Sequence, residues 1–241
     1  GADTAYSEEV FKIGQKLVTK LFNAAKFCSM NFEILRDLHV CHSEPQTCHS
    51  KPQTCHPEQS EGSHVAKIDP SAAPQDDKLK AQDDNFQITE ASDIWILSRL
   101  HETTKKATQE FEKFEYARAR EAIEEFFWKD FCDNYLEICK VRSYGLSAEK
   151  IARLEFTDEE KNQIIAKQQS AILTLEICLN NLLKLFAPFI PHICDEIYAV
   201  IFADEFAQSQ SISARGNWPK FDEILFDKKF YELGNAALEI I

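Results

Sequence analysis

Glycine is scarce in this sequence, with six glycines among 241 residues. Phosphate-binding loops need several glycines at fixed spacing, and neither G-x-G-x-x-G nor G-x-x-x-x-G-K-[ST] occurs. The chain also lacks any apolar run near the roughly 20 residues that cross a bilayer. We therefore expect neither a nucleotide-dependent active site nor a membrane partner in this segment.

Catalytic signatures are lacking as well. H-E-x-x-H and G-x-S-x-G do not occur. A di-iron bundle would need Glu-x-x-His pairs on facing helices, which the expected helices do not carry. His101 and His192 fall in different expected helices, where a single histidine is usually structural. We predict no catalytic residue, no metal ligand and no cofactor in this segment.

The charge is strongly acidic, with 40 Asp and Glu against 27 Lys and Arg, a net charge of -13. A uniformly acidic surface repels phosphate, so we expect no DNA partner, although a local basic face remains possible. Several cysteines lie among apolar residues, as small buried hydrophobes do. This usage predicts a reducing, cytoplasmic location. These cysteines are Cys28, Cys132, Cys139, Cys178 and Cys194.

Residues 41–85 contain no aromatic residue and hold five of the eight prolines. Such a segment buries too little apolar surface to offset the entropy of ordering it. We predict a disordered insertion over residues 37–88. It contains a seven-residue repeat, Cys41–Thr47 and Cys48–Thr54, with a decayed copy at Cys55–Gln59. The repeat is either low-complexity sequence or a metal-capturing Cys-His arm; we favour low complexity because its spacing matches no common zinc pattern.

The rest of the chain has helical periodicity almost throughout, and strand-like alternation is not sustained anywhere. We expect helices over about 92–114, 116–141 and from Thr157, where Thr157 and Glu160 form a capping box. Pro191 suits the start of another helix, and a last one begins near Lys228. The prediction is an all-α, up-and-down helical bundle interrupted by the insertion. Its parts are a lead-in and first helix (1–36), the insertion (37–88), the remaining bundle (89–203) and an acidic extension (204–241).

Two faces are expected on the first helix. At 100° per residue an apolar stripe falls on one side, and basic and amide side chains fall on the other. Residues 10–36 carry five Lys or Arg and one Glu, a local net charge of +4. The basic side is either a solvated lysine face or a binding surface. The apolar stripe comprises Val10, Ile13, Leu17, Leu21, Ala24 and Cys28, and the polar side comprises Lys12, Lys16, Thr19, Lys20, Asn23 and Lys26.

An aromatic cluster follows in the third helix, comprising Phe126-Phe127-Trp128, Phe131 and Tyr135. Such a cluster could stack nucleobases. Core packing is the favoured interpretation, because the positions fit an interior face and the intervening Asp130 and Asp133 would repel phosphate.

Four blocks carry a resemblance to a known family. They run over Lys20–Phe27 (KLFNAAKF), Asp93–Leu100 (DIWILSRL), Phe127–Glu137 (FWKDFCDNYLE) and Leu182–Pro191 (LLKLFAPFIP). In this order they resemble the anticodon-binding domain of the valyl-tRNA synthetase family. Isoleucyl- and leucyl-tRNA synthetases share the bundle, but the Asp-Phe-Cys-Asp block favours the valyl family.

The resemblance implies a parent class I synthetase, a valine–tRNA ligase that uses ATP and Mg²⁺ in a separate Rossmann domain. The family's His-Ile-Gly-His and Lys-Met-Ser-Lys-Ser signatures are absent, so this segment is expected to be a piece of a longer, monomeric protein. A coiled-coil arm is expected beyond Ile241. Asn134 and Tyr198 stand where the family usually has Trp, and we expect this difference to affect core packing.

The resemblance also implies the RNA-binding residues. The helix with Asn23 and Lys26 is expected to lie against the anticodon loop of a valine-accepting tRNA. We predict that Asn23, with Arg99, contacts a base, and that Lys16, Lys20 and Lys26 contact phosphates. Asn suits adenine, the central base of valine anticodons. The rival prediction is a helical interaction scaffold with a metal-binding Cys-His arm.

Overall fold

The computed structural model describes residues 8–42, 87–144, 156–202, 212 and 217–239. The described residues are helical apart from short connections and contain no strand, which confirms the all-α prediction. The elements in chain order are α1 (Glu8–His42), α2 (Ala91–Glu112), α3 (Tyr116–Glu125), the π-helix η1 (Phe126–Tyr135), α4 (Leu136–Ser143), α6 (Asp158–Phe186), α7 (Pro191–Ile201), the 3₁₀ turn η2 (Phe221–Glu223) and α9 (Lys228–Leu238).

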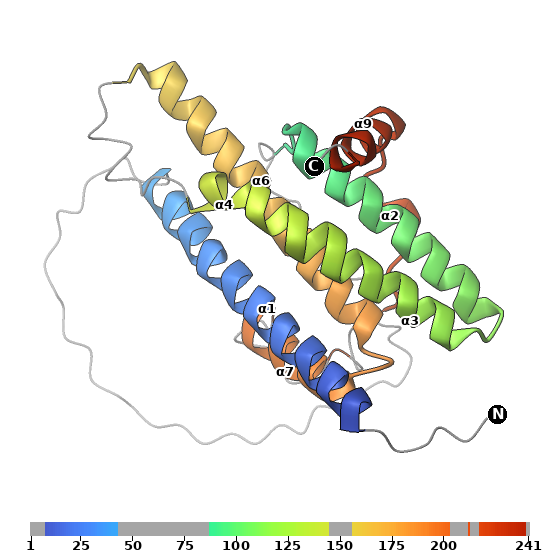
Figure 1. Cartoon of the computed structure of the whole chain (residues 1–241). Helices are drawn as coiled ribbons and strands as arrows, with labels where there is room; N and C mark the ends of the chain where they lie inside the picture. The colour runs from blue at the N-terminus through green and yellow to red at the C-terminus, as the bar shows by residue number, and fades with distance from the viewer. Residues whose placement is uncertain (1–7, 43–86, 145–155, 203–211, 213–216, 240–241) are drawn as a thin grey trace, which may run out of the picture.

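Successive long helices alternate in direction, as an up-and-down bundle requires (Figure 1). The capping box at the start of α6 is present: the Glu160 backbone N–H donates to Thr157 Oγ1 at 3.3 Å, and the Thr157 N–H donates to Glu160 Oε2 at 2.9 Å. Pro191 occupies the first turn of α7, as predicted. α6 packs against α1, α2, α3, α4 and α7, so it is the central helix. Its fully buried apolar side chains are Ala171, Ile172, Leu175, Cys178, Leu179, Leu182, Leu183, Leu185 and Phe186.

The expected single helix over residues 116–141 is three consecutive segments, α3, η1 and α4. The Leu136 N–H donates to the Phe131 carbonyl, an i→i−5 bond that marks the wide π turn. An α-helical period over 116–141 predicts that Ile138 points inward together with Ile123 and Phe127. This prediction is wrong, because Ile138 is 46% exposed and Cys139 is buried instead. A π segment shifts the buried face relative to an unbroken α-helix, and α periodicity alone does not reveal that shift.

The apolar stripe of α1 is confirmed at Leu17, Leu21, Ala24 and Cys28, which are all buried. The prediction for Ile13 is wrong, because Ile13 is 63% exposed. The packed part of α1 therefore begins near Leu17, and the preceding turns extend past the core.

α1 continues to His42, six residues beyond the expected boundary at residue 36. Residues 37–42 contain neither Pro nor Gly, so nothing in this stretch stops the helix before Pro45. The Cys-His repeat falls mainly in residues 43–86, outside the described residues. The predictions of a disordered insertion and of a metal-binding arm therefore stay predictions.

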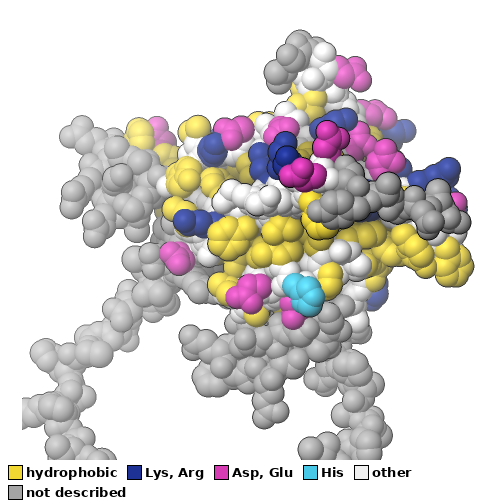
Figure 2. Space-filling view, turned by 60° about the horizontal axis from the view of Figure 1, so that its bottom comes forward, with side chains coloured by type: hydrophobic (Ala, Val, Ile, Leu, Met, Phe, Trp, Pro, Cys, Tyr) yellow, Lys and Arg dark blue, Asp and Glu magenta, His cyan; other side chains and the backbone are white. Residues whose placement is uncertain are grey.

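Among the described residues, no helix combines the length and the apolarity that crossing a membrane demands. The face in Figure 2 carries a band of hydrophobic side chains, and the Lys and Arg side chains there are interspersed with Asp and Glu. This face has no continuous basic surface. Binding of a polyanion to this acidic chain therefore depends on a local arrangement of charges.

Candidate nucleic-acid interface

A shallow hollow of about 500 Å³ lies on the basic side of α1. Three of its lining residues are lysines, and none is a carboxylate, in a chain whose net charge is -13. One wall comes from η1. The lining residues are Lys12, Gln15, Lys16, Thr19, Lys20, Asn23 and Trp128.

The packing of α1 determines which side chains reach this hollow. Leu17, Leu21 and Ala24 are buried in the bundle, and at 100° per residue positions 16, 19, 20 and 23 fall to one side of that buried stripe, with Lys20 nearest to it. Lys16 and Asn23 are exposed, and Lys20 is half-buried. The structure thus brings together three predicted site residues, Lys16, Lys20 and Asn23.

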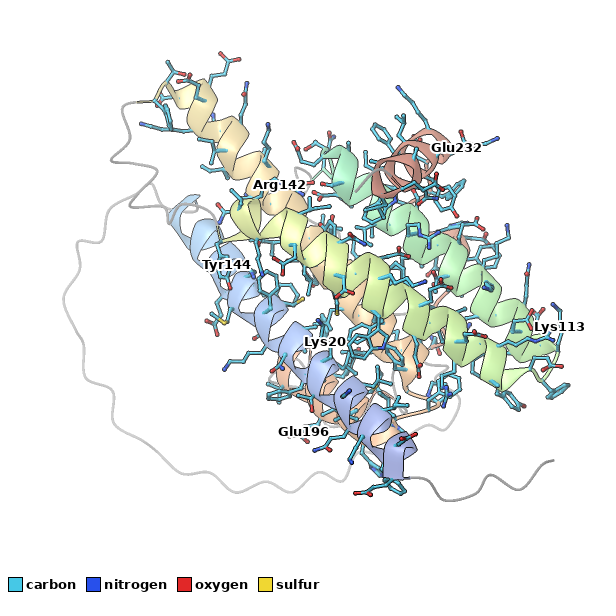
Figure 3. All side chains as sticks on the ribbon, in the orientation of Figure 1. Lys20, Lys113, Arg142, Tyr144, Glu196 and Glu232 are labelled. Atoms are coloured by element: carbon cyan, nitrogen blue, oxygen red, sulfur yellow. The ribbon has the colours of Figure 1, made fainter. Side chains whose placement is uncertain are left out.

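Lys20 lies at the junction between α1 and η1 (Figure 3). Its Nζ is 3.7 Å from Asp133 Oδ1 and 5.8 Å from the centroid of the Trp128 ring. The ammonium therefore has an ion-pair partner and an aromatic face at the same time. Asp133 holds Lys20 beside the hollow, and its own charge partly cancels that of the lysine.

The π-helix explains why Trp128 and Asp133 reach the same lysine. The two residues are five apart, the span of one i→i+5 hydrogen bond of the π-helix, so they lie closer to the same side of η1 than they would in an α-helix. In an α-helix, at 100° per residue, they would point roughly 140° apart. An α-helical period does not predict that Trp128 and Asp133 approach the same lysine. The only signal in the sequence is the close spacing of aromatic and acidic residues over 126–135.

Lys26 is exposed on α1, one turn past Asn23, and is not among the residues that line the hollow. Within the described residues, neither the Lys26 ammonium nor the Asn23 amide has a side-chain partner. Phe27, next in sequence, packs edge-on against Tyr144 with ring centroids 5.5 Å apart. This end of the face therefore offers a cation and an amide that no described side chain pairs with, beside an aromatic pair.

The structure does not bring Arg99 to the hollow. Arg99 lies on α2, where its Nε donates to Asp130 Oδ2 at 2.9 Å and its NH1 donates to the Tyr231 hydroxyl at 3.1 Å. These bonds join α2 to η1 and α9. Burial raises the pKa of the Asp130 carboxyl, although the Arg99 guanidinium opposes that rise.

A second hollow of about 580 Å³ lies on the α3 side of Trp128. Three basic and three acidic side chains line it, so its local charge balances to zero. The lining residues are Ala117, Arg118, Arg120, Glu121, Glu124, Glu125, Trp128 and Lys129.

The part of the chain that the structure describes has no group of three or more His, Cys, Asp or Glu side chains able to hold a metal ion. Burial raises the pKa of Cys132 to about 12, even with Lys20 nearby. A thiol with that pKa is protonated at neutral pH and is a poor nucleophile or metal ligand.

Comparison with known proteins identifies the class. Residues 93–241 match the family described as "Anticodon-binding domain of tRNA ligase". The match covers more than half of the chain and includes α2 through α9. The chain belongs to this family, whose domain continues through residues 204–241, expected above to be an acidic extension.

The relatives are valine–tRNA ligases. That of Wolbachia sp. subsp. Brugia malayi is 35% identical over 241 residues, covering 100% of this chain and 21% of the relative. That of Rickettsia felis is 37% identical over 224 residues, covering 93% and 20%. That of Ehrlichia canis is 35% identical over 243 residues, covering 100% and 22%. The predicted resemblance to the valyl-tRNA synthetase family is confirmed, and the chain spans about a fifth of the length of these relatives.

Proposed function

We propose that this chain is the anticodon-recognition part of a valine–tRNA ligase and binds the anticodon loop of a valine-accepting tRNA. The family match and the names of the relatives support this proposal. The parent protein would attach valine to its tRNA with ATP and Mg²⁺, in a catalytic domain that carries the signatures absent from this chain. The buried free cysteines are in keeping with a reducing cytoplasm, and we propose a monomer there.

The observation that carries the proposal is the charge of the α1 hollow. Its lining holds three lysines, two amides and a hydroxyl, without a carboxylate. Lysines bind phosphates without regard to sequence, and amides read the exposed edges of unpaired bases. A lysine- and amide-lined hollow on an otherwise acidic chain is suited to a short single-stranded RNA loop.

Asn23 is the proposed base-reading residue. Its amide carries a donor and an acceptor, which can pair with the adenine N7 and N6 groups. It is exposed at the end of the hollow, where Lys16 and Lys20 are one or two turns away on the same face. We propose phosphate contacts for Lys16, Lys20 and Lys26. We leave Arg99 out, because its guanidinium is bonded to Asp130 and Tyr231.

Paired substitutions on α1 test these roles. Asn23→Ala should weaken binding of the valine anticodon stem-loop by roughly 1–3 kcal/mol and reduce discrimination against a loop with a changed central base. Lys16→Ala should weaken both loops equally and lower the slope of log K against log salt by about one. Lys228→Ala, on α9, is the charge-matched control and should change neither. Full discrimination in Asn23→Ala would remove the base-reading role.

A further inference from the structure

Trp128 differs from the other aromatic residues of its cluster. Phe126, Phe127, Phe131 and Tyr135 are at most 1% exposed, which confirms that they are core residues. Trp128 is only half-buried and forms a wall of both hollows. Its indole ring therefore stands as a ridge between two surface depressions.

The indole N–H of Trp128 is also unusual. Trp95 Nε1 donates to Asn235 Oδ1 at 3.1 Å, and Trp218 Nε1 donates to Thr108 Oγ1 at 2.8 Å. Trp128 Nε1 has no such partner among the residues that the structure describes. The group is not among the buried polar atoms that lack a partner in the described residues, so water can reach it. A ribose or phosphate oxygen of a bound RNA can replace that water as the acceptor.

From these observations we propose that Trp128 is a stacking platform for one nucleobase of the RNA that occupies the α1 hollow. The proposal rests on the proposed function and adds a contact outside the base-reading amide of Asn23. Every nucleobase has a π-face, so an indole contributes affinity with little dependence on sequence. We therefore expect an effect on binding strength and little effect on base preference.

The charges around Trp128 favour RNA binding on the α1 side of the ring. That hollow has three lysines and no carboxylate, whereas three basic and three acidic side chains line the α3 side. Phosphates adjoining a stacked base would be attracted on the first side, and the balanced charges of the second side give no net attraction. The Lys20 ammonium lies over this face of the ring, 5.8 Å from its centroid, so it must move aside when a base stacks there. The displaced lysine can then bind a phosphate next to that base.

Asp133 does not preclude this arrangement. It lies five residues from Trp128 and 3.7 Å from the Lys20 ammonium, so the lysine offsets part of its charge. The π-helix η1 carries both Trp128 and Asp133, so it brings the ring and the carboxylate to the same lysine. Stacking and phosphate binding can therefore occur at the junction of α1 and η1.

Two variants test the proposal in the 241-residue chain, with circular dichroism as the check of folding. Trp128→Leu removes the ring and should weaken binding of the valine anticodon stem-loop by roughly 5- to 150-fold, equally for a loop with a changed central base. Trp128→Phe keeps an aromatic face and should lose less than about fivefold. Wild-type affinity in a folded Trp128→Leu variant would overturn the proposal.

Fluorescence gives a second readout that does not need the Leu variant to fold. Stacking of a base on Trp128 should quench tryptophan emission in the wild-type chain during the titration. The quenching should be absent in Trp128→Phe, which retains Trp95 and Trp218. Quenching of equal size in Trp128→Phe would overturn the proposal.

The binding data separate failure of the stacking role from failure of the proposed function. If Trp128→Leu binds normally and still discriminates between loops, the stacking role is wrong and the proposed function stands. If the wild type binds neither loop, both are contradicted.

Discussion

The Asp93 carboxylate and the Arg142 guanidinium form an ion pair that ties the first turn of α2 to the last turn of α4. Arg142 NH1 donates to Asp93 Oδ2 at 2.9 Å, and the Asp93 side chain is fully buried. The same carboxylate accepts hydrogen bonds from the Tyr135 hydroxyl at 2.9 Å and from Ser170 Oγ at 2.7 Å. Side chains from η1, α4 and α6 therefore all bind the Asp93 carboxylate of α2. These contacts fix the π-helix against the rest of the bundle.

Removal of Arg142 should destabilise the fold strongly. Arg142→Met leaves the Asp93 carboxylate buried without its cation, so the free energy of unfolding should fall by about 3–5 kcal/mol. Urea unfolding followed by circular dichroism measures the change. Lys228→Met is the control, since it breaks the exposed Lys228–Glu232 pair and should leave the midpoint unchanged. Equal midpoints for the two variants would contradict the structural role of Asp93.

Two glycines in helices should respond to alanine with opposite signs. A Cβ on Gly234 of α9 would overlap the Trp95 ring on α2, whereas a Cβ on Gly14 of α1 has no neighbour within 4 Å. Gly14→Ala should stabilise the chain by about 0.5–1 kcal/mol through helix propensity alone.

Gly234→Ala should instead cost roughly 1–3 kcal/mol by overpacking and should loosen α9 from α2. Hydrogen exchange of the α9 amides and urea unfolding of both variants measure the effects. A stabilising Gly234→Ala would show that α9 does not pack on Trp95 as described.

Asp133 should restrain RNA binding. Asp133→Asn frees Lys20 and removes a negative charge beside the hollow, so the stem-loop should bind more tightly, by up to about fivefold at low salt, since exposed ion pairs contribute about 0–1 kcal/mol. The gain should shrink in high salt, because screening weakens interactions between exposed charges. Anisotropy titrations at two salt concentrations measure both effects. Weaker binding of this variant would mean that Asp133 orients Lys20 for the RNA rather than competing with it.

Buried thiols should make stability depend on alkaline pH. Burial raises the pKa of Cys132, Cys139 and Cys194 to about 12, from a reference value near 9. The unfolded chain therefore loses these protons first as the pH rises. Their contribution to stability is fully present below about pH 9 and is lost between about pH 9 and 12.

Alkylation tests the same protection directly. At about pH 8.5, iodoacetamide should leave these three cysteines unmodified in the folded chain and modify them in urea, because the thiolate is the reactive form. Peptide mass spectrometry identifies the modified sites. Equal modification of folded and unfolded chains would contradict their burial.

Much of the fold could be predicted from the sequence because its signals are local. The capping box of Thr157 and Glu160, Pro191 at a helix start and the apolar spacing of α6 each act within a few residues. The π-helix could not be predicted in this way. Its i→i+5 bonds depend on how Phe126, Phe131 and Tyr135 fit the core, and an α-helical period assigns Ile138 to the wrong face.

The candidate site was predictable in part for the same reason. Lys16, Lys20 and Asn23 share a face by helical geometry, so the sequence places them together. Arg99 is different, because its hydrogen-bond partner Tyr231 lies 132 residues away in sequence. The sequence pattern favours core packing for Trp128 and its neighbours, whereas in the structure its ring is half-buried and lines both hollows.

The most direct measurement is a fluorescence anisotropy titration of the 241-residue chain with a valine anticodon stem-loop, beside a stem-loop with a changed central base. We predict tighter binding of the valine loop, with affinity that falls as salt rises because phosphate contacts release counterions. Equal affinity for the two loops, or absence of binding to both, would contradict anticodon recognition by this chain.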